Sequence, residues 1–147
     1  MFKHILVPTD GSALSTDTVK KAIEFARETG ARITFFYAKP EYPVSFYGEG
    51  ALIDPTTPEK FAELADEQAQ TLLSAAASLA IEREVHSASL AITSDVPFEA
   101  IITAAAQAGC DLIFMASHGR RGISGLLLGS ETQKVLTHST IPVLVYR

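Results

Sequence analysis

The sequence predicts a single α/β domain with an open five-stranded parallel sheet and helices on both faces. The chain has 147 residues, which is the size of one ordinary domain. Five short apolar segments alternate with four segments of helical spacing, without an internal repeat. Most of the apolar segments lack the polar alternation of a half-exposed strand, as expected where helices cover both faces of a sheet.

Five segments rich in Ile, Leu, Val, Phe and Tyr are predicted to be the strands. They cover residues 3–7, 32–37, 86–92, 111–116 and 143–146. Residues 86–92 alternate small polar and apolar side chains, so we expect this strand at an edge of the sheet. Because strands and helices alternate, we expect the right-handed crossovers of a doubly wound sheet. Such sheets bind ligands beyond the carboxyl ends of their strands, where the strand order reverses.

Capping residues and helical spacing predict the first two helices. The first covers residues 15–29 and ends at Gly30, which suits a left-handed C-terminal position. The second begins with Thr57 as its N-cap and Pro58 at the first helical position. The predicted buried faces are Val19, Ala22, Ile23 and Ala26 in the first helix, and Phe61, Leu64, Ala65, Leu72, Ala76 and Leu79 in the second.

Two further helices follow the same logic. Pro97 opens the third, which ends at Gly109, and the fourth follows Gly129 and ends before Pro142. Their inward residues are expected to be Ile101, Ile102 and Ala105 in the third helix, and Val135 and Leu136 in the fourth. The connection over residues 38–57 is longer than the usual length of about 2 to 6 residues, and it is predicted to be either a lid or a contact with a partner.

Composition and charge exclude several classes of protein. Hydrophobic residues make up 47% and charged residues 20%, so the chain is not predicted to be disordered. With 17 acidic and 12 basic residues the net charge is −5, and we expect no nucleic-acid partner. The single cysteine, Cys110, is expected to be a small buried hydrophobic residue. Because neither a signal peptide nor a membrane-spanning run is apparent, we expect a cytoplasmic protein without a membrane partner.

A glycine-rich stretch between the fourth strand and the fourth helix has the features of a phosphate site. It runs from Gly119 to Gly129 and enters a helix at Ser130. Glycines let backbone N–H groups converge on an anion, and a helix N-terminus adds unpaired donors and a positive dipole end. Arg120 or Arg121 would add a cation. The alternative is a simple turn with solvated arginines, and both interpretations stay open at this point.

Asp10 stands at the carboxyl end of the first strand. Its carboxylate is well placed to accept hydrogen bonds from a ribose in the crevice of a doubly wound sheet. The alternative is that Asp10 or Ser12 caps the following helix. The residues alone do not separate these roles.

The sequence lacks several common catalytic signatures. We find no P-loop, no Gly-x-Gly-x-x-Gly after the first strand and no Gly-x-Ser-x-Gly elbow. Ser117, His118 and Asp10 are not expected to form a triad, because neighbouring residues at a strand end tend to point to opposite sides. A phosphoacceptor domain of the receiver type is not expected either, since Asp95 at the end of the third strand lacks the rest of that constellation.

Three segments together resemble the universal stress protein family. They are ILVPTDGS at residues 5–12, ASHG at residues 116–119 followed nine residues later by Gly129 and Ser130, and the closing PVLVY at residues 142–146. Val96 and Pro97 before the third helix fit the same pattern, and the resemblance covers essentially the whole chain. The glycine motif is similar to that of the nucleotide-binding branch of the family.

The resemblance implies a Rossmann-like sheet, of the type named for adenine nucleotide alpha hydrolases, in strand order 3-2-1-4-5. It also implies ATP or AMP across the switch point, with Mg²⁺ or Mn²⁺ accompanying the triphosphate, and a homodimer formed through the last strand. Asp10 would bind the sugar hydroxyls and the backbone of Ala38 would meet the adenine edge. The nucleotide-binding residues implied are Pro8, Thr9, Asp10, Ala38, Ala116, Ser117, His118, Gly119, Arg120, Arg121, Gly129, Ser130 and Glu131.

One position departs from the family motif, because Ala116 stands where its first glycine is expected. A Cβ there would disfavour binding by roughly 1 kcal/mol if the position needed a positive φ, and would be harmless if Ala116 merely continued the strand. The strand-like sequence before it favours the second interpretation, although preference between ATP and AMP stays open.

Two functional hypotheses remain. The first is a nucleotide-dependent stress-response or signalling switch, and the second is a dimeric adaptor of the same fold that works without nucleotide. No residue near the expected phosphates is an evident general base for water, so we expect at most slow ATP hydrolysis and assign no catalytic residue.

Overall fold

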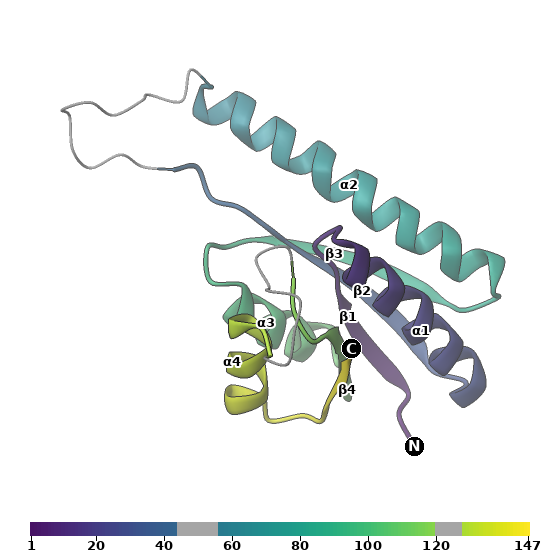
Figure 1. Cartoon of the computed structure of the whole chain (residues 1–147). Helices are drawn as coiled ribbons and strands as arrows, with labels where there is room; N and C mark the ends of the chain where they lie inside the picture. The colour runs from purple at the N-terminus through teal and green to yellow at the C-terminus, as the bar shows by residue number, and fades with distance from the viewer. Residues whose placement is uncertain (44–55, 120–127) are drawn as a thin grey trace.

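Five parallel strands form the sheet at the centre of the computed structural model, which describes residues 1–43, 56–119 and 128–147 (Figure 1). The strands are β1 His4–Pro8, β2 Arg32–Lys39, β3 Ser87–Thr93, β4 Leu112–Ala116 and β5 Val143–Tyr146. Their order is β3-β2-β1-β4-β5, which confirms the predicted order and places β3 at an edge. The order reverses between β1 and β4, so the switch point lies where these two strands end.

Four helices cover the sheet in the described part of the chain: α1 Ala13–Thr29, α2 Pro58–Glu82, α3 Pro97–Ala108 and α4 Ser130–His138. Helices α1 and α2 lie on one face and α3 and α4 on the other (Figure 1). Thr57 caps α2 by accepting a hydrogen bond from the backbone N–H of Lys60, and Gly30 ends α1 with φ 71°. Both predicted caps are therefore confirmed.

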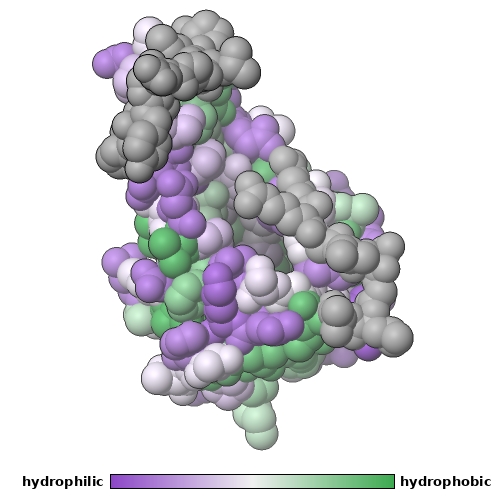
Figure 2. Space-filling model, turned by 60° about the vertical axis from the view of Figure 1, so that its left-hand side comes forward, coloured by the Kyte–Doolittle hydropathy of each residue, from purple (hydrophilic) through white to green (hydrophobic). Residues whose placement is uncertain are grey.

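The sheet is buried on both faces, as the apolar strands predict. Ile5 and Phe35 point into the core under α1 and α2, whereas their neighbours Leu6 and Phe36 point into the core under α3 and α4. All four side chains are at most 1% exposed. On the face drawn in Figure 2, hydrophilic side chains predominate and hydrophobic ones form small groups among them.

The predicted buried face of α2 is only partly correct. Its buried residues are Ala69, Leu73, Ala76 and Ala80, all in the later turns of the helix. Leu64, which was expected inside, is 47% exposed. Leu64 borders a hollow between the first turns of α2 and Tyr37 of β2, so its side chain is not packed closely against the sheet. Helical spacing identifies a face but does not reveal how closely that face packs along its whole length.

At the amino ends of the strands, polar side chains bridge β1, β2 and the start of β4. His4 Nε2 lies 2.8 Å from Thr34 Oγ1 in the interior, and the Asp111 carboxylate accepts hydrogen bonds from the backbone N–H groups of Lys3 and His4. Beside them Cys110 is buried, as expected, and burial raises the pKa of its thiol to about 11. This cluster lies at the opposite end of the strands from the switch point, and its contacts are structural.

The stability of the protein should fall as the pH drops below about 6.5, the usual pKa of an unfolded histidine. Burial, aided by the charge of Arg32, lowers the pKa of His4 although Asp111 acts to raise it. Below pH 6.5 His4 binds a proton in the unfolded chain but stays neutral in the folded one. The free energy of unfolding therefore falls by at most about 1.4 kcal/mol per pH unit until the pH reaches the pKa of folded His4. Urea unfolding at pH 7.5 and 5.5 measures this difference.

The matched control for this titration is His4→Gln, which keeps an amide near Thr34 but does not titrate in this range. The variant should lose part of the pH dependence between these two values. An unchanged slope would assign the pH dependence to other groups.

Candidate functional site

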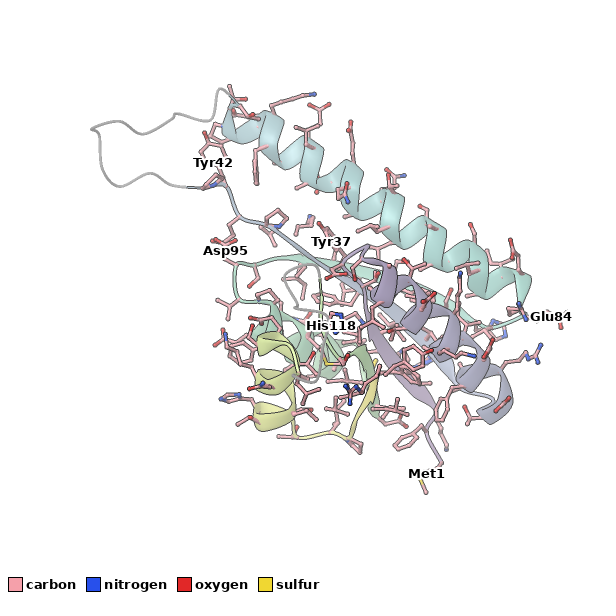
Figure 3. The ribbon with its side chains drawn as sticks, viewed as in Figure 1. Met1, Tyr37, Tyr42, Glu84, Asp95 and His118 are labelled. Carbon is pink, nitrogen blue, oxygen red and sulfur yellow. The ribbon has the colours of Figure 1, made fainter. Side chains whose placement is uncertain are left out.

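The ends of β1 and β4 lie side by side at the switch point, because these strands pair directly. Thr9 and Asp10 follow β1, and residues 117–119 follow β4, where Figure 3 labels His118. A Cβ placed on Gly119 would overlap Oδ2 of Asp10, so the two segments touch. The structure thus brings together residues that are more than one hundred positions apart in the sequence.

The turn after β1 is held by a compact set of hydrogen bonds. The backbone N–H of Thr9 donates to the carbonyl of Phe36 at 2.8 Å, and its hydroxyl lies 2.8 Å from that of Ser15. The Ser15 hydroxyl also accepts from the backbone N–H of Asp10 at 3.1 Å. Thr9 is buried, so its hydroxyl helps to fix the backbone from which Asp10 projects.

Of the two candidates for the N-cap of α1, Asp10 and Ser12, the structure selects Ser12. Ser12 is the N-cap of α1 and accepts from the backbone N–H of Ser15 at 3.2 Å. Asp10 Oδ1 accepts from the backbone N–H of Ser12 at 2.9 Å, while Oδ2 lies against Gly119. Gly11 between them has φ 79°, a conformation that suits glycine. Asp10 therefore supports the turn and at the same time reaches the end of β4.

The N-terminus of α4 is fastened to the end of β4. The hydroxyl of Thr132 donates to the carbonyl of Ala116 at 3.0 Å, and the backbone N–H of Gly129 donates to the carbonyl of Ser117 at 2.7 Å. A Cβ on Gly129 would lie 3.0 Å from Cα of His118, which is closer than ordinary packing allows. Gly129 is required here for close approach of two backbone segments.

The first turn of α4 leaves backbone donors for a ligand. Its N-cap is Gly129, which has no side chain to cap the helix. The backbone N–H of Gln133 donates to the carbonyl of Gly129 and closes the first turn. The N–H groups of Ser130, Glu131 and Thr132 precede that bond and cannot have a partner within the helix. Together with the positive end of the helix dipole they favour an anion.

The Glu131 side chain is engaged with α3. Its Oε2 accepts from the backbone N–H of Phe98 at 2.9 Å, and Oε1 lies 3.4 Å from Lys134 Nζ. The N-cap of α3 is Val96, which makes no capping hydrogen bond, so Glu131 caps α3 from the neighbouring helix. Only the backbone of Glu131 is therefore suited to meet a phosphate.

Replacing Glu131 by alanine should destabilise the protein by about 1 kcal/mol, the usual cost of losing a helix cap. The Phe98 N–H would lose its acceptor, and the first turns of α3 and α4 would lose a direct link. Glu131→Gln retains an acceptor oxygen and should cost less. Chemical denaturation of the three proteins at neutral pH gives the comparison, and equal stability of the alanine variant would show that the cap contributes nothing.

Ala116 is the last residue of β4 and pairs with Tyr146 of β5. Among the described non-glycine residues, only Glu84 has a positive φ. The expectation that Ala116 continues the strand is confirmed, and its Cβ causes no backbone strain.

Ser117 and His118 differ from the sequence-based expectation. Ser117 Oγ lies 3.2 Å from His118 Nδ1, so the two neighbouring side chains meet instead of pointing apart. Ser117 is 4% exposed, which leaves its hydroxyl little access to a substrate. The contact orders the end of β4 and gives no support to a nucleophilic triad.

The remaining predicted residues divide into two groups. Pro8 and Ala38 are half-buried at the ends of β1 and β2. Arg120 and Arg121 lie outside the described residues.

Within the described residues, no cluster of three or more His, Cys, Asp or Glu side chains is arranged to hold a metal ion. The described helices include none with the length and apolar character needed to cross a membrane.

Comparison with known proteins identifies relatives of the whole chain. Residues 1–147 match the family model described as "Universal stress protein family". The chain is 32% identical over 150 residues to the universal stress protein MJ0531 of Methanocaldococcus jannaschii, covering 100% of this chain and 83% of the relative. It superposes on UspA of Lactobacillus plantarum with a TM-score of 0.76 and 25% identity, covering 99% and 97% of the two chains.

Two further solved structures are complexes with adenine nucleotides. One is a universal stress protein with cAMP, with a TM-score of 0.71, 22% identity and coverage of 99% and 97%. The other is a universal stress protein of Archaeoglobus fulgidus with dAMP, with a TM-score of 0.65, 19% identity and coverage of 99% and 98%. At these identities both share the fold of this chain.

Proposed function

The chain belongs to the universal stress protein family, and we propose that it binds an adenine nucleotide, ATP or AMP, at the carboxyl edge of the sheet between β1 and β4. The bound nucleotide would make it a stress-response or signalling switch. The observation that carries the proposal is the N-terminus of α4, which has no side-chain cap and is held beside the ends of β1 and β4. The complexes of family members with cAMP and dAMP support the class of ligand.

In this proposal the phosphates lie at the first turn of α4. The backbone N–H groups of Ser130 and Glu131 and the exposed hydroxyl of Ser130 donate to phosphate oxygens. Gly129 keeps this turn against the end of β4, so the donors are in place before a ligand binds. Arg120 and Arg121, although outside the described residues, would add positive charge from the glycine-rich stretch.

The nucleoside lies between the ends of β1, β2 and β4 in the same proposal. Asp10 accepts hydrogen bonds from the ribose hydroxyls, and Thr9 acts indirectly by fixing the Asp10 backbone through Ser15. Pro8 borders the adenine, and the backbone of Ala38 meets its polar edge. The backbone of residues 116–119 lines the sugar.

A divalent cation would accompany the triphosphate, held mainly by phosphate oxygens. The uncapped N-terminus of α4 suits the phosphate oxygens, and these oxygens would carry the cation. In this proposal the ribose hydroxyls occupy the Asp10 carboxylate, and Glu131 Oε2 accepts from the backbone N–H of Phe98, so neither is placed to activate water. We therefore propose at most slow ATP hydrolysis, below about 1 turnover per second.

Calorimetry with ATP and AMP tests the proposal. Both should release measurable heat and raise the melting temperature, and GTP serves as the control for recognition of the base. Absorbance near 260 nm after purification and denaturation would reveal copurified nucleotide. No heat and no thermal shift at millimolar ATP and AMP would overturn the proposal and favour the nucleotide-independent adaptor.

We also propose that the protein is a homodimer formed through β5. This strand is at an edge of the sheet and hydrogen-bonds only to β4 among the described strands. All four of its residues are apolar or aromatic and half-buried, and such an edge tends to pair with another chain. Sedimentation equilibrium should give twice the mass of one chain, and a monomer at micromolar concentration would contradict this arrangement.

A further inference from the structure

The connection between β3 and α3, residues 94–98, is hydrogen-bonded to the end of β2. The backbone N–H of Ser94 donates to the carbonyl of Lys39 at 2.9 Å, and Oδ1 of Asp95 accepts from the backbone N–H of Glu41 at 3.0 Å. Figure 3 shows Asp95 beside this part of the chain. Both bonds lie immediately beyond the backbone proposed to meet the adenine. We call residues 94–98 the α3 brace.

The other end of the α3 brace is joined to the first turn of α4. The backbone N–H of Phe98 donates to Oε2 of Glu131 at 2.9 Å. The Phe98 ring also packs on α4, with its centroid 5.1 Å from that of the His138 ring and 5.5 Å from Lys134 Nζ. Glu131 belongs to the turn whose backbone N–H groups are proposed to meet the phosphates. The α3 brace therefore reaches from the adenine end of the proposed site to its phosphate end.

The backbone within the α3 brace is locally fixed. The N–H of Val96 donates to Oγ of Ser94 at 3.0 Å, and Pro97 restricts its own φ to about −65°. The backbone N–H of Ala100 donates to the carbonyl of Val96 at 3.2 Å and closes the first turn of α3. The brace therefore has few freely rotating bonds between its two ends.

The attachments of the α3 brace are few and close to the surface. The N–H of Phe98 lies in the first turn of α3, where it cannot have a partner within the helix, so its acceptor is supplied by Glu131 of α4. Asp95 is exposed, and the neighbouring Val96 is 41% exposed. Segments held by exposed hydrogen bonds and few buried contacts open locally at a small cost in free energy. A ligand that fixes both ends of such a segment can therefore change how often it opens.

We propose that nucleotide binding orders the α3 brace, so that its exposed surface at Asp95 and Val96 reports whether the site is occupied. Phosphates held by the first turn of α4 fix the backbone of Glu131, and with it the acceptor for Phe98. The adenine fixes the end of β2, and with it the N–H of Glu41. By linkage, an ordered brace strengthens nucleotide binding in turn. This inference rests on the proposed nucleotide site and names the segment through which occupancy of that site is reported.

Hydrogen exchange of individual amides, followed by NMR on the full chain, first tests the brace without a ligand. Glu131→Ala removes the acceptor of the Phe98 amide, which should exchange at least about three-fold faster, and the Glu41 amide at the far end should exchange at least about two-fold faster. Glu131→Gln retains an acceptor oxygen and should restore both rates. The control is the Lys60 amide, which the Thr57 side chain caps at 3.1 Å on the other face of the sheet and which should keep its rate.

Saturating AMP is then added to the unaltered chain. The Phe98 and Glu41 amides should each exchange at least about three-fold more slowly, whereas the rate of the Lys60 amide should change by less than about two-fold. The capped start of α2 serves as the comparison because it has the same kind of side-chain bond but no contact with the brace in the described part of the chain.

Variants of two exposed carboxylates test the coupling in the opposite direction. Asp95→Ala breaks the bond to Glu41 without removing a proposed ligand contact, and it should weaken AMP binding by about three-fold. Asp95→Asn retains an acceptor oxygen and should restore the affinity. Glu99→Ala removes the same charge from an exposed position in the first turn of α3 that takes no part in these bonds, and it should leave the AMP affinity unchanged.

The outcomes separate this inference from the proposed function. Absence of AMP binding in calorimetry would overturn the proposed site, and the inference would fail with it. If AMP binds but the Glu41 amide keeps its rate, or if Glu131→Ala accelerates only the Phe98 amide, the brace does not join the two ends of the site and this inference alone is wrong. Equal AMP affinities of Asp95→Ala and Glu99→Ala would exclude it as well.

Discussion

Gly129→Val is expected to weaken nucleotide binding by at least about ten-fold and to destabilise the fold by about 2 to 3 kcal/mol. A Cβ at this position would lie 3.0 Å from Cα of His118 and 3.2 Å from the carbonyl oxygen of Ser117. Both neighbours belong to backbone that is fixed at the end of β4, so α4 must move instead. Overpacking of this kind typically costs 1 to 3 kcal/mol, and valine adds two branches beyond the Cβ.

The effect on binding follows from the same displacement. Gly129 donates to the carbonyl of Ser117 at 2.7 Å, and this bond sets the position of the N–H groups proposed to meet the phosphates. Because two backbone segments approach closely at Gly129, the variant is expected to lose stability as well as binding.

A variant that lowers stability elsewhere separates the two effects. Gly30 ends α1 at φ 71° and has nothing within 4 Å of the place where a Cβ would lie. Gly30→Ala should therefore cost roughly 1 kcal/mol through backbone strain alone and leave AMP affinity unchanged. Urea unfolding and calorimetry of both variants test this, and wild-type affinity in Gly129→Val would contradict the placement of the phosphates.

The fold could be predicted from the sequence because its signals are local. Thr57 and Gly30 mark helix ends through their own chemistry, and the two-sided burial of Phe35 and Phe36 follows from an apolar run that lacks alternation. The exposure of Leu64 could not be predicted in this way. It depends on how closely the first turns of α2 pack against the end of β2, which is a property of the assembled layers.

The same distinction applies to the candidate site. Asp10, Gly119 and Gly129 could be identified from their places after strands and before a helix. Their mutual contacts could not, since Asp10 and Gly119 are separated by most of the chain. Glu131 illustrates the limit, because its position suggests a phosphate site whereas its side chain caps α3 at Phe98.

Gly119→Ala is expected to reduce nucleotide affinity by at least about ten-fold with little change in stability. Gly119 does not have a positive φ, so alanine is compatible with its backbone. The new Cβ would overlap Oδ2 of Asp10 and force that carboxylate to turn away from the end of β4. A hydrogen bond to a charged group contributes about 1.5 to 3 kcal/mol, which corresponds to a loss of roughly ten-fold or more.

A double-mutant cycle shows whether the new methyl group acts through Asp10. Asp10→Ala alone should also weaken AMP binding by roughly ten-fold or more, because it removes the proposed acceptor for the ribose hydroxyls. If Gly119→Ala acts by displacing that carboxylate, adding it to Asp10→Ala should cause almost no further loss, since the displaced group is already gone. Calorimetric affinities of the four proteins for AMP complete the cycle. Additive losses would mean that the methyl group blocks the ligand directly, and the proposed position of the ribose against Asp10 would then be wrong.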